Sequence, residues 1–354
     1  MIYGGFYGSN KYYWLKTFLS IMTSKITRRE FLKIGSLAAM GIGLPVYPPG
    51  GNPYLSTPAL RMGRTTRSLN YYEHPSYASG ELGYYNTDAV INIFKEKMGD
   101  ARVDECPIWV KSEDGWLNST FIQPVRNVKN QPVMNIPAGG MLAEVTVPFT
   151  QSWSMDNDRR KRAYRFYYSS THWVHNAYPT SDGNIWYRIL DDGNKGSFLV
   201  MAEDLRPITE KEISPISPDV LNKHIEVDLT GQRLKAFENE KPVFSARIAS
   251  GYFEGDTPMG EFTVERKNPS RHMAARTETS EFDLPGVPWV CFISWTGVSI
   301  HGTYWHNNYG TPQSHGCINL TPEAAKWIYR WTDPFVPVED NYEESENGTK
   351  VVIY

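Results

Sequence analysis

Alternating apolar and polar positions recur through the last third of the chain, in short runs separated by turn residues. Residues 224–229 alternate, 230–233 form a turn, and 234–237 supply the returning strand. Helical spacing follows Thr321 and Pro322, residue types that favour the N-cap and the first helical position. Further strands are expected at 243–248, 260–266, 288–295 and 349–353. The pattern predicts a mainly β domain over 223–354 with one or two short helices.

Residues 102–210 carry a similar β pattern in shorter pieces. Turn sequences such as Glu113-Asp114-Gly115 and Asp182-Gly183-Asn184 separate them. Strands are expected at 108–110, 115–117, 141–145, 173–174 and 186–190. Several short strands with regular turns predict a small barrel or sandwich. The stretch at 186–207 resembles a bacterial SH3-like module, which implies a small β-barrel.

Two stretches lack a sustained pattern and are predicted to be linkers. Residues 48–101 are rich in Pro, Gly, Ser and Tyr, and helical spacing within 87–97 predicts one short helix there. Residues 211–222 are rich in Pro and Ser. The expected chain is therefore mainly β, with a small SH3-like module followed by a larger β domain.

The first 47 residues show the pattern of an export signal. The basic run 27–33 precedes an uncharged apolar stretch at 34–46, and its paired arginines followed by Phe31-Leu32-Lys33 resemble the twin-arginine signal. The resemblance implies export to the cell envelope. The apolar stretch is shorter than the roughly 20 residues that span a bilayer. Cleavage or retention as a membrane anchor stays open, as does the start at Met1 or, with 1–21 as a misread extension, at Met22.

Composition narrows the classes of function. The chain has 36 Lys+Arg and 39 Asp+Glu, a net charge of −3, whereas nucleic-acid binders usually carry a basic excess. Its 40% hydrophobic and 21% charged residues exclude wholesale disorder. Three cysteines cannot build a disulfide framework, and one must remain unpaired.

One cysteine lies in a context suited to nucleophilic catalysis. Cys317 closes the sequence Ser314-His315-Gly316-Cys317, and His301-Gly302-Thr303 lies 16 positions upstream. A thiol must lose its proton to act as a nucleophile, and an imidazole can accept that proton. The glycines permit backbone conformations that bring histidine to sulfur, and amides near Gly316 and Cys317 are candidate oxyanion donors. A zinc site is disfavoured because the histidines and cysteine lack the usual ligand spacing, so no metal is predicted.

These residues resemble the L,D-transpeptidase family of peptidoglycan cross-linking enzymes, whose catalytic domain is of the YkuD type. Ser314-His315-Gly316-Cys317-Ile318-Asn319 matches the family pattern at every position. Ser250-Gly251 followed by 257–262 is similar to a second family segment. The resemblance covers 223–354 and implies a β-sandwich catalytic domain.

The resemblance also implies a role for each residue of the motif. Cys317 would be the nucleophile and His301 its general base, with the Gly302 carbonyl orienting the imidazole. His315 would shape the pocket, whereas the loop-supporting and substrate-binding residues would be Ser314, Gly316, Asn319 and Thr303. A peptidoglycan stem peptide would acylate Cys317 with loss of its terminal D-residue, and an acceptor amine would then take the acyl group. The family needs no cofactor, and carbapenem-type inhibitors are expected to acylate the cysteine.

Several alternatives stay open. Water could resolve the acyl-enzyme, which would make the protein a cysteine peptidase or carboxypeptidase acting on the same stem peptides. The chain could instead be a non-catalytic wall-binding protein, although the intact His301 and Cys317 argue against that. The cations Lys267, Arg271 and Arg276 either meet stem-peptide carboxylates or lie on a solvated loop. The acceptor amine and the oligomeric state are not given by the sequence.

Overall fold

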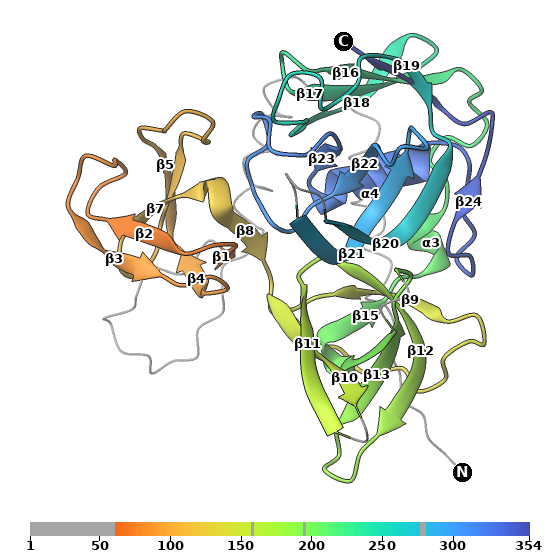
Figure 1. Cartoon of the computed structure of the whole chain (residues 1–354), viewed down its shortest axis with the longest axis horizontal. Coiled ribbons are helices and arrows are strands. Elements are labelled where there is room, and N and C mark those ends of the chain that lie inside the picture. The colour runs from red at the N-terminus through yellow and green to blue at the C-terminus, as the bar shows by residue number, and fades with distance from the viewer. Residues whose placement is uncertain (1–60, 157–158, 194–195, 277–280) are drawn as a thin grey trace, which may run out of the picture. The chain divides into compact units, whose positions relative to one another are not determined.

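β-strands dominate the computed structural model, which describes residues 61–156, 159–193, 196–276 and 281–354 (Figure 1). The expectation of a mainly β fold is confirmed. The export signal predicted at 1–47 lies outside the described residues. In the part of the chain that is described, no helix has both the length and the apolar character needed to cross a membrane.

Residues 61–125 form two small sheets, which we call the first β module. The three-stranded sheet has the order β4-β1-β8, and the five-stranded sheet has the order β3-β2-β7-β6-β5. The elements are β1 Arg61–Thr65, β2 Leu69–Tyr72, β3 Glu81–Tyr85, β4 Val90–Ile93, β5 Lys95–Met98, β6 Ile108–Lys111, β7 Trp116–Asn118, η2 Ser119–Phe121 and β8 Ile122–Val125. Its core consists of Ile91, Ile93, Val110, Leu117 and Ile122.

The predicted linker with a short helix at 48–101 is wrong over its described part. The supposed helical stretch contains β4, in which Ile91 and Ile93 are buried and their neighbours are exposed. β-branched residues at a period of two favour a strand over a helix. The predicted boundary at 102 is wrong as well, because β6 pairs with β5 and so joins the first β module.

Residues 141–207 form one seven-stranded antiparallel sheet, the second β module. Its order is β11-β10-β14-β13-β12-β9-β15. The elements are β9 Met141–Val145, β10 Phe149–Asp156, β11 Arg159–Tyr167, β12 Thr171–Pro179, β13 Ile185–Leu190, β14 Ser197–Met201, η3 Ala202–Asp204 and β15 Leu205–Pro207. The strands expected at 141–145 and 186–190 are confirmed. The SH3-like character of this region stays a prediction.

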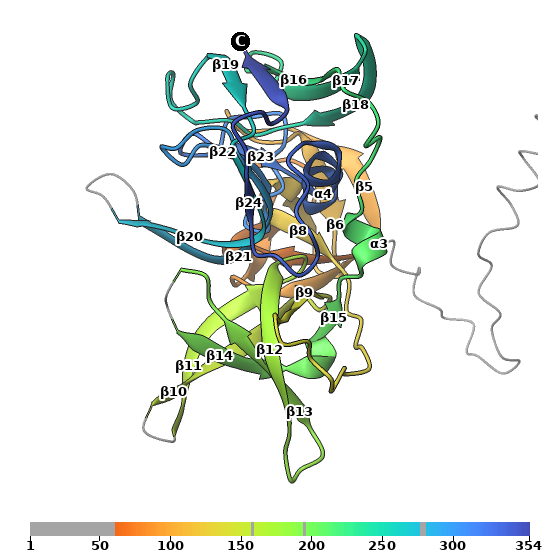
Figure 2. The same cartoon turned by 90° about the vertical axis from the view of Figure 1, so that its right-hand side faces the viewer.

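Residues 223–354 contain two five-stranded sheets and the helix α4 (Figure 2). The sheet orders are β18-β17-β16-β25-β19 and β23-β22-β21-β20-β24. The elements are β16 Lys223–Asp228, β17 Arg233–Glu238, β18 Lys241–Arg247, β19 Gly260–Thr263, β20 Arg266–Arg276, β21 Glu281–Phe292, β22 Ser299–Gly302, β23 Ile318–Leu320, α4 Pro322–Trp331, β24 Glu343–Glu344 and β25 Lys350–Ile353. Both sheets and α4 contribute to one apolar cluster, including Ile225, Trp289, Ile300, Ile318 and Ile328.

The predicted start of α4 is confirmed. The Thr321 hydroxyl accepts a hydrogen bond from the Ala324 amide at 3.2 Å, and Pro322 occupies the first turn. The predicted linker at 211–222 needs a correction, because it begins inside a one-turn helix, α3 (Glu210–Ile213). Thr209 and Glu212 cap this turn reciprocally, a pattern that stabilises a helix start.

A buried arginine ties the first β module to the rest of the described chain. Arg64 is 2% exposed and donates hydrogen bonds to Asp88 at 2.6 Å and to Gln123 at 2.8 and 3.0 Å. It also donates to the Tyr304 carbonyl at 2.6 Å, and its guanidinium lies 4.0 Å from the centre of the Tyr167 ring. A buried guanidinium is strongly unfavourable unless it is paired, so this network fixes the surrounding strands in one arrangement.

Candidate active site

Two parallel strands bring the histidine and the cysteine of the motif together. β22 pairs with β23 so that His301 lies opposite Asn319, and Ile300 lies opposite Ile318. Cys317 directly precedes β23 and so lies at the same end of the pair as the start of β22. All four residues of β22 are buried, which fixes the histidine on a rigid element. The parallel pairing of β22 with β23 therefore brings His301 and Cys317 close together, although they lie 16 positions apart in the sequence.

The Cys317 sulfur is half-buried in a polar environment. It lies 3.6 Å from the Ser299 hydroxyl and 3.8 Å from the Gly297 carbonyl oxygen. Burial acts to raise the pKa of Cys317, but hydrogen bonding with His301, the charge of His301 and hydrogen bonding with Ser299 lower it by more, so the net shift is downward. The environment therefore favours the thiolate, the nucleophilic form of cysteine.

The tautomer of His301 follows from its backbone neighbour. Its Nδ1 lies 3.0 Å from the Gly302 carbonyl oxygen, which can only accept, so Nδ1 carries a proton. Nε2 is then the nitrogen that can take the thiol proton. Gly302 is tightly enclosed, because a Cβ there would lie 2.9 Å from Pro288 Cγ and 3.0 Å from Pro322 Cα.

Gly316 gives the turn before Cys317 its shape. Its φ is +128°, and an added Cβ would lie 2.7 Å from the Asp256 carbonyl oxygen. The Gly316 amide donates to the Ser314 hydroxyl at 3.0 Å, and that hydroxyl donates to the Cys317 carbonyl at 2.5 Å. The suggestion that the Gly316 amide serves an oxyanion is therefore corrected, because Ser314 already occupies this donor.

The second family-like segment holds this turn in place. The Ser250 carbonyl accepts hydrogen bonds from the amides of Gln313 and Ser314, both at 2.9 Å. The Thr257 hydroxyl donates to the Gly316 carbonyl at 2.8 Å and accepts from the Gly251 amide at 2.8 Å. Residues separated by about 60 positions thus fix the backbone just before the cysteine.

Asn319 and Thr303, which lie two positions after Cys317 and His301 in the chain, are both buried. Asn319 Nδ2 lies 2.9 Å from His306 Nε2, and burial lowers the pKa of His306 to about 3, so that ring is neutral. Its Nδ1 accepts a hydrogen bond from the Asn308 amide at 3.2 Å. The Thr303 hydroxyl lies 2.6 Å from the Tyr309 hydroxyl, and the Thr303 amide donates to the Leu320 carbonyl at 3.0 Å. These contacts hold the two strands together beneath the site.

His315 takes a different position from His301. It is exposed, and its ring stacks on Phe282 of β21 with 5.7 Å between ring centres. The hydrogen bond to Cys317 comes from His301 instead. In the described ranges, no group of three or more His, Cys, Asp or Glu side chains is arranged to hold a metal ion.

Sequence reasoning missed Ser299, whose hydroxyl contacts the sulfur. The signal was present, because residues two apart in a strand face the same side, and Ser299 precedes His301 by two. Two of the three cations considered for substrate carboxylates, Lys267 and Arg271, have other partners in the structure. Lys267 is 1% exposed and donates to the Thr332 and Pro334 carbonyls at 2.7 and 2.6 Å, and Arg271 pairs with Asp192 at 3.0 Å.

Comparison with protein families agrees with this geometry. The family model described as the L,D-transpeptidase catalytic domain, YkuD, matches residues 222–353. This part of the chain is thus similar to that catalytic domain. The match includes β22, β23 and the turn that carries Cys317, and it leaves both β modules outside.

Curated relatives match parts of the same region. L,D-transpeptidase 1 of Mycobacterium tuberculosis is 32% identical over 90 residues, which are 23% of this chain and 36% of that protein. The putative L,D-transpeptidase YkuD of Bacillus licheniformis is 29% identical over 109 residues, 29% of this chain and 56% of that protein. The chain thus spans less than two thirds of the length of either relative.

Solved structures show a similar partial match. The catalytic domain of the Enterococcus faecium L,D-transpeptidase acylated by ertapenem is 28% identical, with a TM-score of 0.30 over 38% of this chain and 97% of that one. An L,D-transpeptidase from Mycobacterium smegmatis is 16% identical, with a TM-score of 0.31 over 75% of this chain and 99% of that one.

Proposed function

We propose that this protein is a peptidoglycan L,D-transpeptidase with Cys317 as its nucleophile. The position of His301 on β22, beside the start of β23 where Cys317 lies, and its lowering of the Cys317 pKa carry the proposal inside the matched region. His301 Nε2 takes the thiol proton, and the thiolate attacks the stem-peptide carbonyl between an L- and a D-residue. The tetrahedral intermediate collapses to a thioester, and the departing D-residue takes the proton back from His301 as its amine leaves.

The second half-reaction uses the same groups in reverse. An acceptor amine from a neighbouring stem attacks the thioester carbonyl, His301 takes a proton from that amine, and sulfur leaves as the thiolate. An amide bond forms and the thioester bond breaks, so no cofactor or external energy source is needed. Ser299 stabilises the thiolate in both steps through its hydroxyl.

The remaining motif residues act by positioning. Ser314 and Gly316 hold the turn, Asn319 and Thr303 support the strands, and His315 with Phe282 forms an exposed aromatic surface beside the cysteine for the bound peptide. We also propose that the protein works in the cell envelope after twin-arginine export. Residues 27–46 support that location by their charge and hydropathy pattern.

Acylation by a carbapenem tests the nucleophile directly. The full chain, Cys317→Ala and the matched control Cys106→Ala would each be incubated with the inhibitor and weighed by intact-protein mass spectrometry. Cys106 is a half-buried thiol of the first β module. We expect one adduct on the wild type and on Cys106→Ala, and none on Cys317→Ala. An adduct on Cys317→Ala, or none on folded wild type, contradicts the proposal.

A stem tetrapeptide with an acceptor amine tests the reaction. A cross-linked product of the expected mass, absent with Cys317→Ala, supports transfer. Release of the terminal D-residue with only a shortened peptide as co-product would identify a carboxypeptidase instead.

A further inference from the structure

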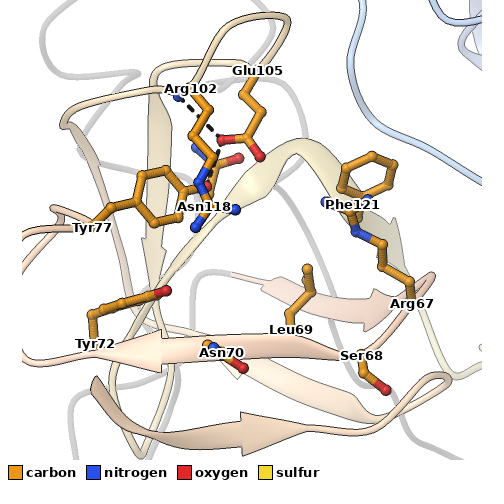
Figure 3. Close-up of a pocket in the computed structure, with 10 residues that line it drawn as sticks. All are labelled: Arg67, Ser68, Leu69, Asn70, Tyr72, Tyr77, Arg102, Glu105, Asn118 and Phe121. Atoms are coloured by element: carbon orange, nitrogen blue, oxygen red, sulfur yellow. Dashed lines mark hydrogen bonds between the residues drawn. The ribbon is translucent and has the colours of Figure 1, made fainter.

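A hollow in the first β module has the chemistry of an anion site. Its volume is 180 Å³, and we call it the arginine hollow. Arg67 and Arg102 contribute its two cationic side chains. Its lining also includes Ser68, Leu69, Asn70, Tyr72, Tyr77, Glu105, Asn118 and Phe121 (Figure 3). The hollow lies outside the matched catalytic domain, and the mechanism above does not use it.

Both guanidinium groups are held on aromatic rings. Arg67 lies 3.4 Å from the centre of the Phe121 ring, and Arg102 lies 4.1 Å from the centre of the Tyr77 ring. Among the described residues, neither guanidinium forms a salt bridge with a carboxylate. Other arginines of the described chain do have carboxylate partners, namely Arg61, Arg64, Arg165, Arg206 and Arg271. The two hollow arginines are thus pre-positioned with their hydrogen-bond donors available.

The residues that line the arginine hollow carry a net positive charge. The lining carries two arginines and one carboxylate, Glu105, which leaves an excess of positive charge. Glu105 already accepts the Tyr77 hydroxyl at 2.5 Å and the Arg102 amide at 3.3 Å. Burial acts to lower the pKa of Arg67, the charges of Glu105 and Tyr77 act to raise it, and the charge of Arg102 acts to lower it, with a net downward shift. An anion beside the two guanidiniums would add favourable charge to this lining.

The size and lining indicate which anion fits. At about 30 Å³ per water, 180 Å³ holds roughly six waters, enough for the end of one amino-acid residue but not for a sugar chain. A planar carboxylate can pair with a guanidinium through two parallel hydrogen bonds. Tyr72 and Leu69 supply apolar surface for the hydrocarbon of the same residue, and Asn70 on the rim can bond a peptide group.

We propose that the arginine hollow binds a carboxylate-bearing end of a stem peptide. The choice of a stem peptide rests on the proposed function, whereas the preference for a carboxylate rests on the hollow alone. Lys267 and Arg271, which follow the second family-like segment in sequence, donate to backbone carbonyls and pair with Asp192, respectively. Arg67 and Arg102 are therefore the better candidates to receive a substrate carboxylate.

Contacts link the rim of the hollow to the turn that carries Cys317. Asp104, which lies between two lining residues, accepts from the Tyr252 hydroxyl at 3.2 Å, and its carbonyl accepts from Asn308 at 2.7 Å. The Tyr252 amide in turn donates to the Ser314 carbonyl at 2.9 Å. The rim of the hollow and the turn before Cys317 are thus connected through Tyr252.

Nuclear magnetic resonance of one tryptophan gives a readout specific to the hollow. Trp109 packs on Tyr77 and Tyr72, with 4.8 and 5.6 Å between ring centres, and its indole N–H donates to the Asp100 carbonyl at 2.6 Å. The full chain with Cys317→Ala, which cannot turn over, would be titrated with a stem tetrapeptide. The Trp109→Phe variant assigns the signal. We expect the Trp109 indole signal to shift with saturation.

Arginine variants in the same Cys317→Ala background then test the assignment. Arg67→Ala and Arg102→Ala should each raise the dissociation constant about tenfold, the usual size of one charge-assisted hydrogen bond. Arg160→Ala is the matched control, because that guanidinium also lies on a ring, 4.4 Å from the centre of Trp186, in the second β module. It should bind like the parent. Amidating the carboxylates of the peptide should remove the effect of both hollow variants.

Two results would overturn the proposal. One is a dissociation constant in Arg67→Ala and Arg102→Ala equal to that in Arg160→Ala. The other is equal displacement of the peptide by inorganic phosphate, which would assign the hollow to a phosphate-bearing polymer. Because Cys317→Ala performs no chemistry, either result is independent of the acylation test of the proposed function.

Discussion

Replacing Gly316 by alanine tests how strictly the turn before Cys317 is defined. The substitution adds one methyl group to a residue with φ +128°, where an L-residue is strained. The methyl carbon would also lie 2.7 Å from the Asp256 carbonyl oxygen. That oxygen belongs to the backbone of residues 250–262, which we call the clamping segment, so it cannot rotate away as a flexible side chain could.

The Gly316→Ala substitution should have two effects, one on the free energy of unfolding and one on the rate of acylation. Backbone strain at positive φ lowers the free energy of unfolding by about 1–3 kcal/mol. Restoring an ordinary contact of 3.4 Å requires the turn to move by about 0.7 Å. Displacements near 1 Å at a reacting group can slow a reaction about 100-fold, so we expect Gly316→Ala to slow acylation of Cys317 by about 10- to 100-fold.

Gly255 provides the matched control in the same clamping segment. Its φ is +88°, but an added Cβ would meet nothing within 4 Å. Both variants should lose similar stability in thermal unfolding, and only Gly316→Ala should lose acylation rate, measured by time-resolved intact-protein mass spectrometry with a carbapenem. Equal acylation rates in the two variants would refute the argument that contact with Asp256 positions the nucleophile.

Three further predictions follow from the contacts described. His301→Asn removes the hydrogen bond and the charge that lower the pKa of Cys317, so the midpoint of a pH profile of iodoacetamide alkylation should move to higher pH; an unchanged midpoint would exclude His301 as the partner of the thiol. Arg64→Met should lower the free energy of unfolding in urea by about 3 kcal/mol, because Asp88 loses a buried partner, whereas Arg61→Ala, which breaks an exposed pair with Glu96, should lower it by less than about 1 kcal/mol. Burial acts to lower the pKa of His272, but hydrogen bonds and charge from Asp191, 2.5 Å away, and from Asp283 raise it overall. The stability from protonated His272 is therefore present below the ordinary pKa of 6.5 and lost as pH rises through the raised value, so a melting temperature that falls over this range in the wild type should stay flatter in His272→Asn.

Local sequence signals were sufficient where one element determines its own structure. The start of α4 was predictable because Thr321 and Pro322 satisfy a helix terminus without help from distant residues. The catalytic domain was predictable because the turn around Gly316 needs a particular residue at each position, and those residues stand next to each other in the sequence. The pairing of His301 with Cys317 was predictable from their chemistry, because an imidazole can take the proton of a thiol.

Signals failed where long-range pairing decides the structure. The first β module is held together by strands that pair across connections of several residues, such as β5 with β6 across residues 99–107. Four-residue strands also give too few alternations to identify. His306 lies close to Cys317 in the sequence, yet burial makes it a neutral partner for Asn319. The Gly316 amide looked available, yet Ser314 occupies it. In each case the residue that determines the contact could not be recognised from the local sequence, because only the folded chain brings the two groups together.

The position of β25 has a consequence for how the catalytic domain is made. This strand lies between β16, its parallel neighbour, and β19, its antiparallel neighbour, although it follows both in the chain. During synthesis at about 5–20 residues per second, β16 and β19 must wait with unpaired edges until residues 350–353 have emerged. Open strand edges recruit other chains. The sheet beneath the active site therefore closes only after translation of the domain, and the interval before closure is when aggregation competes with folding.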